Sequence, residues 1–357
     1  LGLDRYRGSI IAITGTNGKS TTVSMTEFLL RSLGRSADAC GNIGIPPSSI
    51  PLWKKSDQHH AVIELSSYQL EGALSWPARG AAITSFSYDH LARHKSMENY
   101  FAAKWRVCDW LEDDAIFVVS QDVAEFAMQT KSRWPKCHTI IVCKSEITFE
   151  APSHCVFAEL RENQIFMNDL SIDFDQIGIK GEHNQLNAFV AIMITAHVSN
   201  TSPGSLPPML RKFRGLPYRC ESVFDNGERV IINDSKSTNL ESTLAALSVA
   251  KRPAILVMGG QGKGESYADL KSAADKISHL VTFGASGQEI ADQAPGDVPT
   301  ECFEKMAPAV LRALRLASDN KCDLIFSPGC ASFDEFNNFE HRGAVFTQLV
   351  KDVEKES

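Results

Sequence analysis

The sequence lacks any apolar run that approaches the roughly 20 residues needed to span a bilayer. The opening residues, Leu1 to Arg7, lack the apolar core of a secretory signal, and no initiator methionine precedes them. We therefore expect a cytoplasmic protein with no membrane partner. We also expect the chain to begin partway through a longer gene product.

Basic residues are not in excess, and the cysteines form no recognisable framework. The net charge is −7, which argues against nonspecific nucleic-acid binding because that function needs a basic surface. Nine cysteines occur without a single C-x-x-C pair, and their spacing fits neither a zinc site nor a disulfide scaffold. Most, such as Cys108 and Cys143, stand among apolar residues. We expect reduced core thiols.

What the sequence does contain is an alternation of short apolar runs with helical patterns over 357 residues, enough for two domains. This alternation predicts an α/β fold with a mostly parallel sheet. A helix is expected from Thr22 to Leu33, closed by Gly34, and another from Met97 to about Leu111, with Ser96 as its N-cap. Buried strands are expected at Ile10–Ile13, Ala61–Ile63, Ala81–Ile83, Ile116–Val119, Ile255–Met258, Leu280–Phe283 and Leu324–Phe326.

The middle of the chain predicts an insert and a domain boundary. Residues 155–174 read as extended segments that turn near Glu162, forming a small antiparallel insert, and a helix follows over 185–197. A Pro-rich stretch at 201–208 and Gly215-Leu216-Pro217 indicate a linker. Asp225-Asn226-Gly227 then predicts a hairpin turn. We place one domain at 1–214 and a second, Rossmann-like α/β domain at 215–357.

A glycine turn between a strand and a helix carries the clearest chemical signal. The run Gly15-Thr16-Asn17-Gly18-Lys19-Ser20-Thr21 follows the first buried strand. Glycines let the backbone approach phosphates, and a helix N-terminus attracts anions. In such a P-loop, Lys19 reaches the outer phosphates and the Ser20 hydroxyl ligates Mg²⁺. Ile13 stands where the usual motif has its first glycine, so the loop is a variant. The alternative is a turn that caps an ordinary helix.

From this loop onward the sequence resembles the Mur ligases and the related folylpolyglutamate synthases. The loop itself and Gly41-Asn42-Ile43-Gly44 are typical of Mur ligases. The segments 64–71, 233–239 and 327–343 are similar to those of the D-glutamate-adding members. The family has three domains, and this chain resembles the central ATPase domain and the C-terminal domain. The resemblance thus implies that the N-terminal domain, which holds the UDP group, is absent.

The resemblance implies an ATP-dependent amide ligase of peptidoglycan precursor synthesis. Its substrates would be ATP, D-glutamate and UDP-N-acetylmuramoyl-L-alanine, joined through an acyl phosphate, and we expect a monomer. Two Mg²⁺ ions would offset the charge that crowds a carboxylate attacking a triphosphate. Without its first domain the chain should bind ATP and Mg²⁺ but turn over poorly.

The catalytic and metal-binding residues come from the same resemblance. Glu64 would bind the first Mg²⁺ together with Ser20. The alternative is that Glu64 is simply an exposed carboxylate at the end of a strand. His90 would bind the second Mg²⁺. A zinc pair of His90 with His94 and a simple cap histidine are the alternatives. Lys104, by default a solvated lysine, would be carbamylated by CO₂ and help to hold the second metal. Ala92 stands where the family commonly has Asp.

The substrate contacts are also implied residue by residue. Thr16, Asn17 and Thr21 belong to the ATP loop. Asn184 and Asn187 would contact the nucleotide, although Asn184 could simply cap a helix. From the second domain, Arg219 would contact a phosphate of ATP and Asp234 would contact its ribose. The alternative is that the two residues form a surface ion pair. The acceptor would contact Asn42 and Ser66. The D-glutamate contacts would be Thr238, Lys263, Ser332, Phe333 and Phe339. Leu is usual at the position of Phe333, and both phenylalanines could instead be core residues.

Three rival interpretations remain. Another ligase of the superfamily, such as a folylpolyglutamate synthase, would share the loop but not the segments 64–71 and 327–343. A noncatalytic nucleotide-binding homologue would not need Lys19, Glu64, His90 and Lys104 together. A P-loop kinase or GTPase would explain the loop and none of the later motifs.

Overall fold

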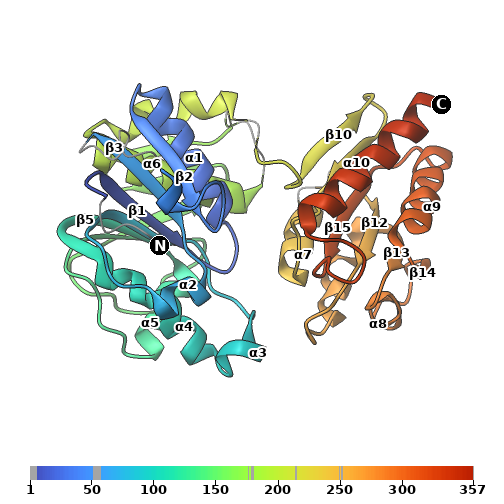
Figure 1. The fold of residues 1–357 in the computed structure, drawn as a ribbon, viewed down its shortest axis with the longest axis horizontal. Helices are drawn as coiled ribbons and strands as arrows, with labels where there is room; N and C mark the ends of the chain where they lie inside the picture. Colours follow the sequence, from blue (N-terminus) through green and yellow to red (C-terminus); the bar gives the residue numbers. More distant parts are fainter. Residues whose placement is uncertain are drawn as a thin grey trace. The chain divides into compact units, whose positions relative to one another are not determined.

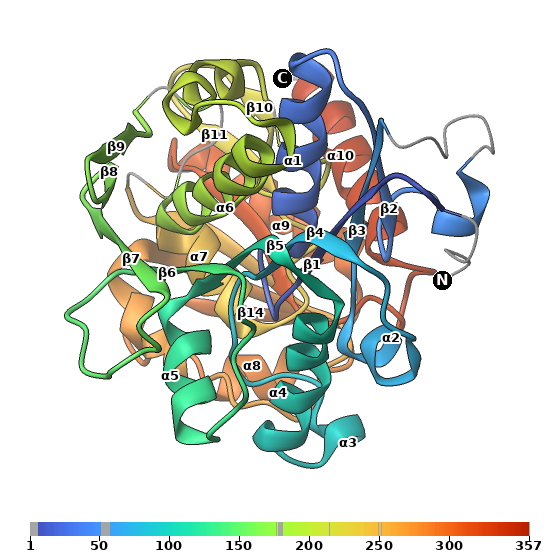
Figure 2. The same ribbon diagram turned by 90° about the vertical axis from the view of Figure 1, so that its left-hand side faces the viewer.

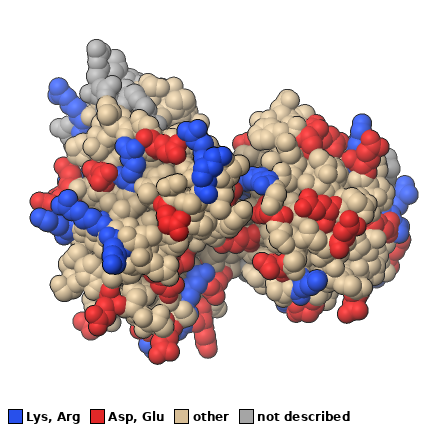
Figure 3. Space-filling view, turned by 90° about the horizontal axis from the view of Figure 1, so that it is seen from below, with Lys and Arg blue, Asp and Glu red and all other residues tan. Residues whose placement is uncertain are grey.

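The computed structural model describes all residues except 1–5, 51–57, 176, 178–180, 214, 249, 251 and 357. The chain divides into two compact units, unit 1 (Leu1–Arg214) and unit 2 (Gly215–Ser357), each with its own sheet and core (Figure 1). No helix in the described part of the chain could cross a membrane. On the face drawn in Figure 3, the described cationic and anionic side chains are intermingled, with no single basic surface.

Unit 1 is built on a sheet of nine described strands in the order β2-β3-β1-β4-β5-β6-β7-β8-β9. The strands from β2 to β7 run parallel, and β8 and β9 add an antiparallel extension. Their bounds are β1 Ser9–Thr14, β2 Ser36–Gly41, β3 His59–Glu64, β4 Ala78–Ile83, β5 Leu111–Ser120, β6 His138–Cys143, β7 Cys155–Arg161, β8 Gln164–Met167 and β9 Leu170–Asp173.

Helices cover both faces of this sheet, because successive residues of each central strand point to opposite sides and both sides are apolar. Ile11 and Ile13 pack with α1 (Lys19–Ser32) and α6 (Glu182–Ser199) on one face. Ile10 and Ala12 face the other side, together with α2 (Ser67–Gly72), α4 (Met97–Trp105) and α5 (Gln121–Gln129) (Figure 2). The remaining helical segments are η1 Pro47–Ser49, α3 Leu91–His94, η3 Arg106–Trp110, η4 Pro203–Ser205 and η5 Pro207–Lys212.

Unit 2 is a second α/β layer structure whose six described strands follow the order β10-β11-β15-β12-β13-β14. Only β10 and β11 pair antiparallel, through the hairpin that Asp225-Asn226-Gly227 predicted. Helices α9 and α10 pack on one face, and α7, η6 and α8 on the other. The bounds are β10 Glu221–Asp225, β11 Val230–Asn233, α7 Leu240–Ser248, β12 Ala254–Gly259, η6 Ala268–Lys276, β13 Ile277–Phe283, α8 Gly287–Asp292, β14 Thr300–Phe303, α9 Met306–Asp319, β15 Leu324–Gly329 and α10 Phe339–Glu356.

The structure confirms the α/β class, the antiparallel insert and every buried strand that the sequence predicted. Two helix boundaries were wrong. Helix α1 begins at Lys19 rather than Thr22, because the glycine turn leads directly into it. Helix α4 ends at Trp105 rather than Leu111, because η3 follows it directly and β5 begins at Leu111. The nine cysteines are free thiols, but Cys302 is exposed and only four of the nine are buried.

Candidate active site

The phosphate loop of unit 1 joins the end of β1 to the start of α1 and leaves no room for side chains at two positions. Gly15 has φ 146°, and a Cβ there would lie 2.1 Å from Thr84 Oγ1. Gly18 has φ 82°, and a Cβ there would lie 2.4 Å from Asn187 Oδ1. Only glycine meets both conditions without strain. The loop is therefore pressed against the segment after β4 and against α6.

The side chain of Lys19 points back over the backbone of the loop. Lys19 Nζ donates hydrogen bonds to the carbonyl oxygens of Gly15 at 2.9 Å and Thr16 at 2.7 Å. Ser20 is buried in the first turn of α1. An ammonium group over a helix N-terminus creates a site for an anion. Asn17 and Thr21 lie on the same loop and first turn, and the Asn17 amide donates to Ser85 Oγ at 2.8 Å.

Glu64 lies at the carboxyl end of β3, directly beside the phosphate loop. Parallel register pairs Ile13 of β1 with Glu64, so the loop and this carboxylate leave the sheet at one edge. Glu64 is 1% exposed, which rules out the exposed strand-end carboxylate. Its Oε1 accepts a hydrogen bond from Asn42 Nδ2 at 3.0 Å. Asn42 is itself exposed, next to Gly41, so it can also reach a ligand.

Lys104 is buried, so the solvated lysine is excluded for this position. Its Nζ donates to the Gly15 carbonyl oxygen at 2.7 Å and lies 4.5 Å from the centre of the Tyr100 ring. Burial, with nearby Lys19, lowers the pKa of Lys104 well below its usual value. A lysine with a lowered pKa offers more of the neutral amine. The surroundings of Lys104 therefore favour its neutral amine.

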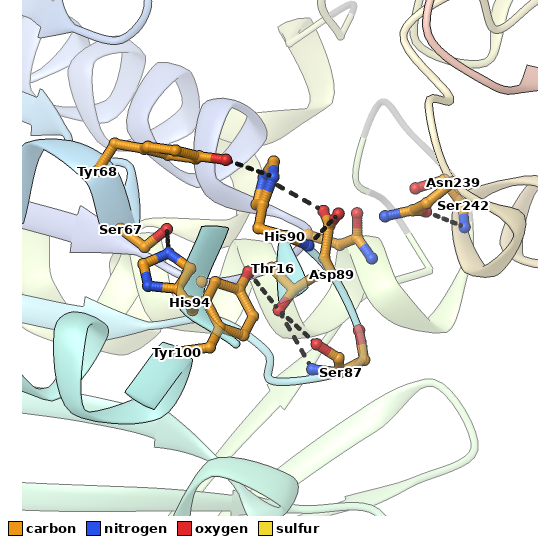
Figure 4. A network of polar contacts seen from close by, with 12 residues as sticks. Thr16, Ser67, Tyr68, Ser87, Asp89, His90, His94, Tyr100, Asn239 and Ser242 are labelled. Atoms are coloured by element: carbon orange, nitrogen blue, oxygen red, sulfur yellow. Dashed lines mark hydrogen bonds and ion pairs between the residues drawn. The ribbon is translucent and has the colours of Figure 1, made fainter. Parts of the chain in front are cut away.

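His90 lies in the loop after β4, between an acid and a phenol (Figure 4). Its backbone is left-handed, with φ 55°, at the N-cap of α3. Nε2 lies 3.4 Å from Asp89 Oδ2, and Nδ1 lies 3.4 Å from Tyr68 Oη. The ring is about one-third exposed, so it remains within reach of a ligand.

His94 has a structural role instead, which excludes the zinc pair. Its Nε2 lies 2.9 Å from Ser67 Oγ (Figure 4). Its Nδ1 lies 3.1 Å from Glu71 Oε1. Both ring nitrogens are therefore occupied, and burial lowers the pKa of His94. Among the described residues, no preformed group of three or more His, Cys, Asp or Glu side chains could hold a metal.

Asn184 and Asn187 face the phosphate loop from α6. Asn187 Oδ1 accepts from Thr22 Oγ1 at 3.2 Å, and its Nδ2 donates to Asn184 Oδ1 at 3.4 Å. Both are buried. Asn184 does not cap the helix, because Gly181 holds the N-cap position. Ser66, by contrast, is the N-cap of α2, where it forms a capping box with Gln69.

Tyr100 is the residue of this site that the sequence did not reveal. It is 1% exposed, and its hydroxyl lies 3.2 Å from Thr16 Oγ1 (Figure 4). Thr16 Oγ1 accepts from the Ser87 amide at 3.2 Å and donates to the Ser87 carbonyl oxygen at 3.4 Å. Because the Thr16 hydroxyl donates its one proton to the Ser87 carbonyl oxygen, Thr16 Oγ1 accepts the hydrogen bond from the Tyr100 hydroxyl. The only available signal was its position four residues before Lys104, on the same helix face.

Unit 2 has polar groups at the carboxyl ends of β11, β12 and β15, which are neighbours in its sheet. Asp234 follows β11 and is buried, so it is not part of a surface ion pair. Its carboxylate accepts from Ser327 Oγ at 2.8 Å and from the Cys220 amide at 3.1 Å. Burial raises the pKa of Asp234 to about 6. Arg219 is half-buried and acts electrostatically on this carboxyl.

The residues expected to bind D-glutamate fall into several places of unit 2. Lys263 is exposed in the loop after β12, which is bridged to the segment after β15 at Gln261 and Ala331. Ser332 is buried in that second segment. Phe333 is 70% exposed, which excludes it from the core. The other two positions are Thr238, which is half-buried, and Phe339, which opens α10 under the ammonium of Lys236.

Sequence relatives of the chain carry one shared name. Residues 13–195 match the family described as the Mur ligase middle domain. A protein of Idiomarina loihiensis named "UDP-N-acetylmuramoylalanine--D-glutamate ligase" is 33% identical over 96% of this chain and 73% of its own. A protein of Synechocystis with the same name is 34% identical over 94% of this chain and 74% of its own.

Solved structures with a similar fold are more distant in sequence. MurF from Acinetobacter baumannii matches with a TM-score of 0.69 and 19% identity, over 96% of this chain and 77% of that one. MurF from Thermotoga maritima in complex with ADP matches with a TM-score of 0.68 and 14% identity, over 98% and 82%. At such identities the likeness concerns the fold alone.

Proposed function

The chain belongs to the Mur ligase family, and from that premise we propose that it is an ATP-dependent ligase that joins D-glutamate to UDP-N-acetylmuramoyl-L-alanine. The relatives that bear the name of this reaction match nearly the whole chain. The observation that carries the proposal is Lys19, whose ammonium group lies over a glycine loop at the N-terminus of α1. Such a loop is suited to the phosphates of ATP.

In this proposal ATP occupies the loop of residues 15–21. When ATP binds, the Lys19 ammonium group leaves the carbonyl oxygens of Gly15 and Thr16 and contacts phosphate oxygens instead. Asn184 and Asn187 contact the nucleotide from α6. From unit 2, Arg219 binds phosphate and Asp234 accepts hydrogen bonds from the ribose.

We propose that the site binds two Mg²⁺ ions together with the nucleotide. Ser20 and Glu64 would hold the first, since a hydroxyl and a buried carboxylate are the hard ligands that Mg²⁺ prefers. His90 and the carbamate of Lys104 would hold the second. To form that carbamate, the neutral amine of Lys104 adds to CO₂ and loses a proton. When bound, the ions would neutralise charge on the phosphates.

Two bond exchanges then make the amide. A carboxylate oxygen of the acceptor attacks the γ-phosphorus, and the bond to the bridging β-γ oxygen breaks, so that ADP leaves. The D-glutamate amine attacks the acyl carbon next, phosphate leaves, and the nitrogen loses a proton. Lys19 stabilises the charge that accumulates on the transferred phosphoryl group.

The remaining contacts are proposed on the same basis. D-glutamate contacts Thr238, Lys263, Ser332, Phe333 and Phe339, with Lys263 supplying the charge for a carboxylate. The acceptor contacts Asn42 and Ser66. We propose that the protein acts as a monomer in the cytoplasm, where ATP is abundant.

Replacing Lys19 tests the nucleotide role. In Lys19→Ala, ATP affinity measured by calorimetry should fall at least about tenfold, and ligation should be lost. Lys212→Ala, which changes an exposed lysine of η5, is the matched control. Unchanged ATP affinity and amide formation in Lys19→Ala would overturn the proposal.

A panel of amino acids separates this function from that of another ligase in the superfamily. ADP release with UDP-N-acetylmuramoyl-L-alanine should depend on D-glutamate rather than L-glutamate or L-alanine. Preference for L-glutamate on a folate acceptor would favour the folylpolyglutamate type. ATP binding without any amino-acid-dependent ADP release would indicate a noncatalytic homologue.

A further inference from the structure

One cavity of unit 1 is lined by no residue of the phosphate loop and has no part in the proposed ligation. It has a volume of about 510 Å³, within the range of small-molecule sites. Its walls come from the end of α4, from η3, from the start of β5 and from residues 132–136. The phosphate loop, by contrast, lies at the carboxyl end of the sheet.

Helix α4 separates this cavity from the active site. Ala102 and Arg106 line the cavity, whereas Tyr100 and Lys104 point toward the phosphate loop. Residues four apart share a helix face, and the two pairs are offset by two residues, so they lie on opposite faces. The cavity is therefore a separate space behind the helix that carries Lys104.

The walls carry charges of both signs that lack protein partners. Arg133 and Lys136 come from the loop after α5, and Asp109, Glu112 and Asp113 come from η3 and β5. None of these five side chains makes an ion pair or hydrogen bond with another described residue. They are exposed, so water solvates them at little cost. A ligand that brought both a carboxylate and an ammonium group could pair with both sets.

Two indoles also line the cavity. Trp105 and Trp134 meet edge to face, with ring centres 5.3 Å apart. Trp105 Nε1 donates to the Arg133 carbonyl oxygen at 3.0 Å, which fixes the loop of Arg133 and Lys136 against α4. Aromatic rings favour apolar or aromatic side chains as neighbours.

We propose that this cavity binds a zwitterionic amino acid or dipeptide with an apolar side chain. Its carboxylate pairs with Arg133 and Lys136, its ammonium group pairs with the acids of η3 and β5, and its side chain packs on the indoles. The charges on the walls decide the class, because only a ligand with charges of both signs can pair with both sets at once.

Calorimetric titration without nucleotide tests this site independently of ligation. The probes are L-phenylalanine, L-leucine and glycyl-L-phenylalanine. At least one should bind with a Kd at or below about 1 mM. N-acetyl-L-phenylalanine lacks the ammonium group, L-phenylalaninamide lacks the carboxylate, and each should bind at least about tenfold more weakly than L-phenylalanine.

Charge-removing variants locate the binding. Lys136→Gln and Glu112→Gln should each weaken the best probe by about fivefold or more, because each removes one pairing charge. Lys212→Gln and Asp169→Asn, at positions outside the cavity lining, are the matched controls and should bind normally. The proposal is overturned if no probe binds, if the singly charged analogues bind as well as L-phenylalanine, or if the cavity variants bind like the controls.

Discussion

At the scale of single residues, Lys104 is the side chain whose surroundings most change its chemistry. Burial lowers its pKa, and only the neutral amine adds to CO₂. We predict that ¹³C-labelled bicarbonate gives a carbamate signal in the NMR spectrum of the chain near neutral pH. The signal should disappear in Lys104→Arg, and ligation should fall about 100-fold or more.

Lys263 provides the control for this experiment, because it is exposed and keeps its charge in Lys263→Arg. That variant should retain the carbamate signal. A signal that survives in Lys104→Arg would assign the carbamate to another amine and remove Lys104 from the second metal site.

Asp234 gives a pH dependence with a defined sign. Burial raises its pKa to about 6, so the folded chain holds this proton between the unfolded value, about 3.9, and 6. Stability from this group therefore falls as pH rises through that window and is constant above it. A ribose hydroxyl donates a stronger hydrogen bond to the ionised carboxylate than to the neutral acid, so the nucleotide contact should weaken as pH falls below about 6.

The effect is isolated by dividing the ATP affinity of the unmodified chain by that of Asp234→Asn at each pH. Protonation of ATP changes both affinities equally, so it cancels in this ratio. We predict that the unmodified chain binds several times more tightly at pH 7.5 and equally at about pH 5. A ratio that does not vary with pH would show that Asp234 does not contact the nucleotide in its ionised form.

At the scale of elements, the two ends of α1 offer a matched pair of glycines. Gly18 and Gly34 both have left-handed backbones, with φ 82° and 74°. A Cβ on Gly18 would collide with Asn187 Oδ1, whereas a Cβ on Gly34 would meet nothing within 4 Å. We predict that Gly18→Ala weakens ATP binding at least about tenfold, while Gly34→Ala costs only about 1 kcal/mol of stability from backbone strain.

Thermal unfolding and ATP titration of both variants separate these effects. Equal ATP affinities in the two alanine variants would mean that the close approach of the loop to α6 is not needed for binding.

The elements themselves were largely readable from the sequence, because their signals are local. Apolar runs such as Ile10–Ile13 marked the buried strands, and Ser96 marked the start of α4. The end of α4 was not readable. The pattern continues through Val107 and Trp110, which are buried in η3, so apolar spacing alone could not distinguish a helix from a tighter turn.

The site was only partly readable, because burial depends on tertiary packing. Lys104 and Glu64 were assigned through resemblance, and sequence alone gave each an exposed alternative that the fold excludes. Tyr100 had no motif at all, and its contact with Thr16 joins residues 84 positions apart. The nucleotide, metal and amino-acid roles remain predictions.

At the scale of the whole molecule, the two units have separate hydrophobic cores, so they should unfold in separate transitions. ATP with Mg²⁺ stabilises each folded unit that binds it, by about 2.7 kcal/mol when the ATP concentration is 100 times the Kd. Lys19 belongs to unit 1, and Arg219 and Asp234 belong to unit 2. We predict that scanning calorimetry shows both transitions rising with ATP in the unmodified chain.

In the double variant Arg219→Ala with Asp234→Asn, only the unit 1 transition should rise, because the contacts from unit 2 are gone. Each kcal/mol moves a transition by about 2–4 °C for a unit of this size, which calorimetry resolves. The change is confined to unit 2, so the P-loop remains an internal control. If the unit 2 transition of the unmodified chain ignores ATP, the proposed contacts from Arg219 and Asp234 are wrong, and the nucleotide is held by unit 1 alone.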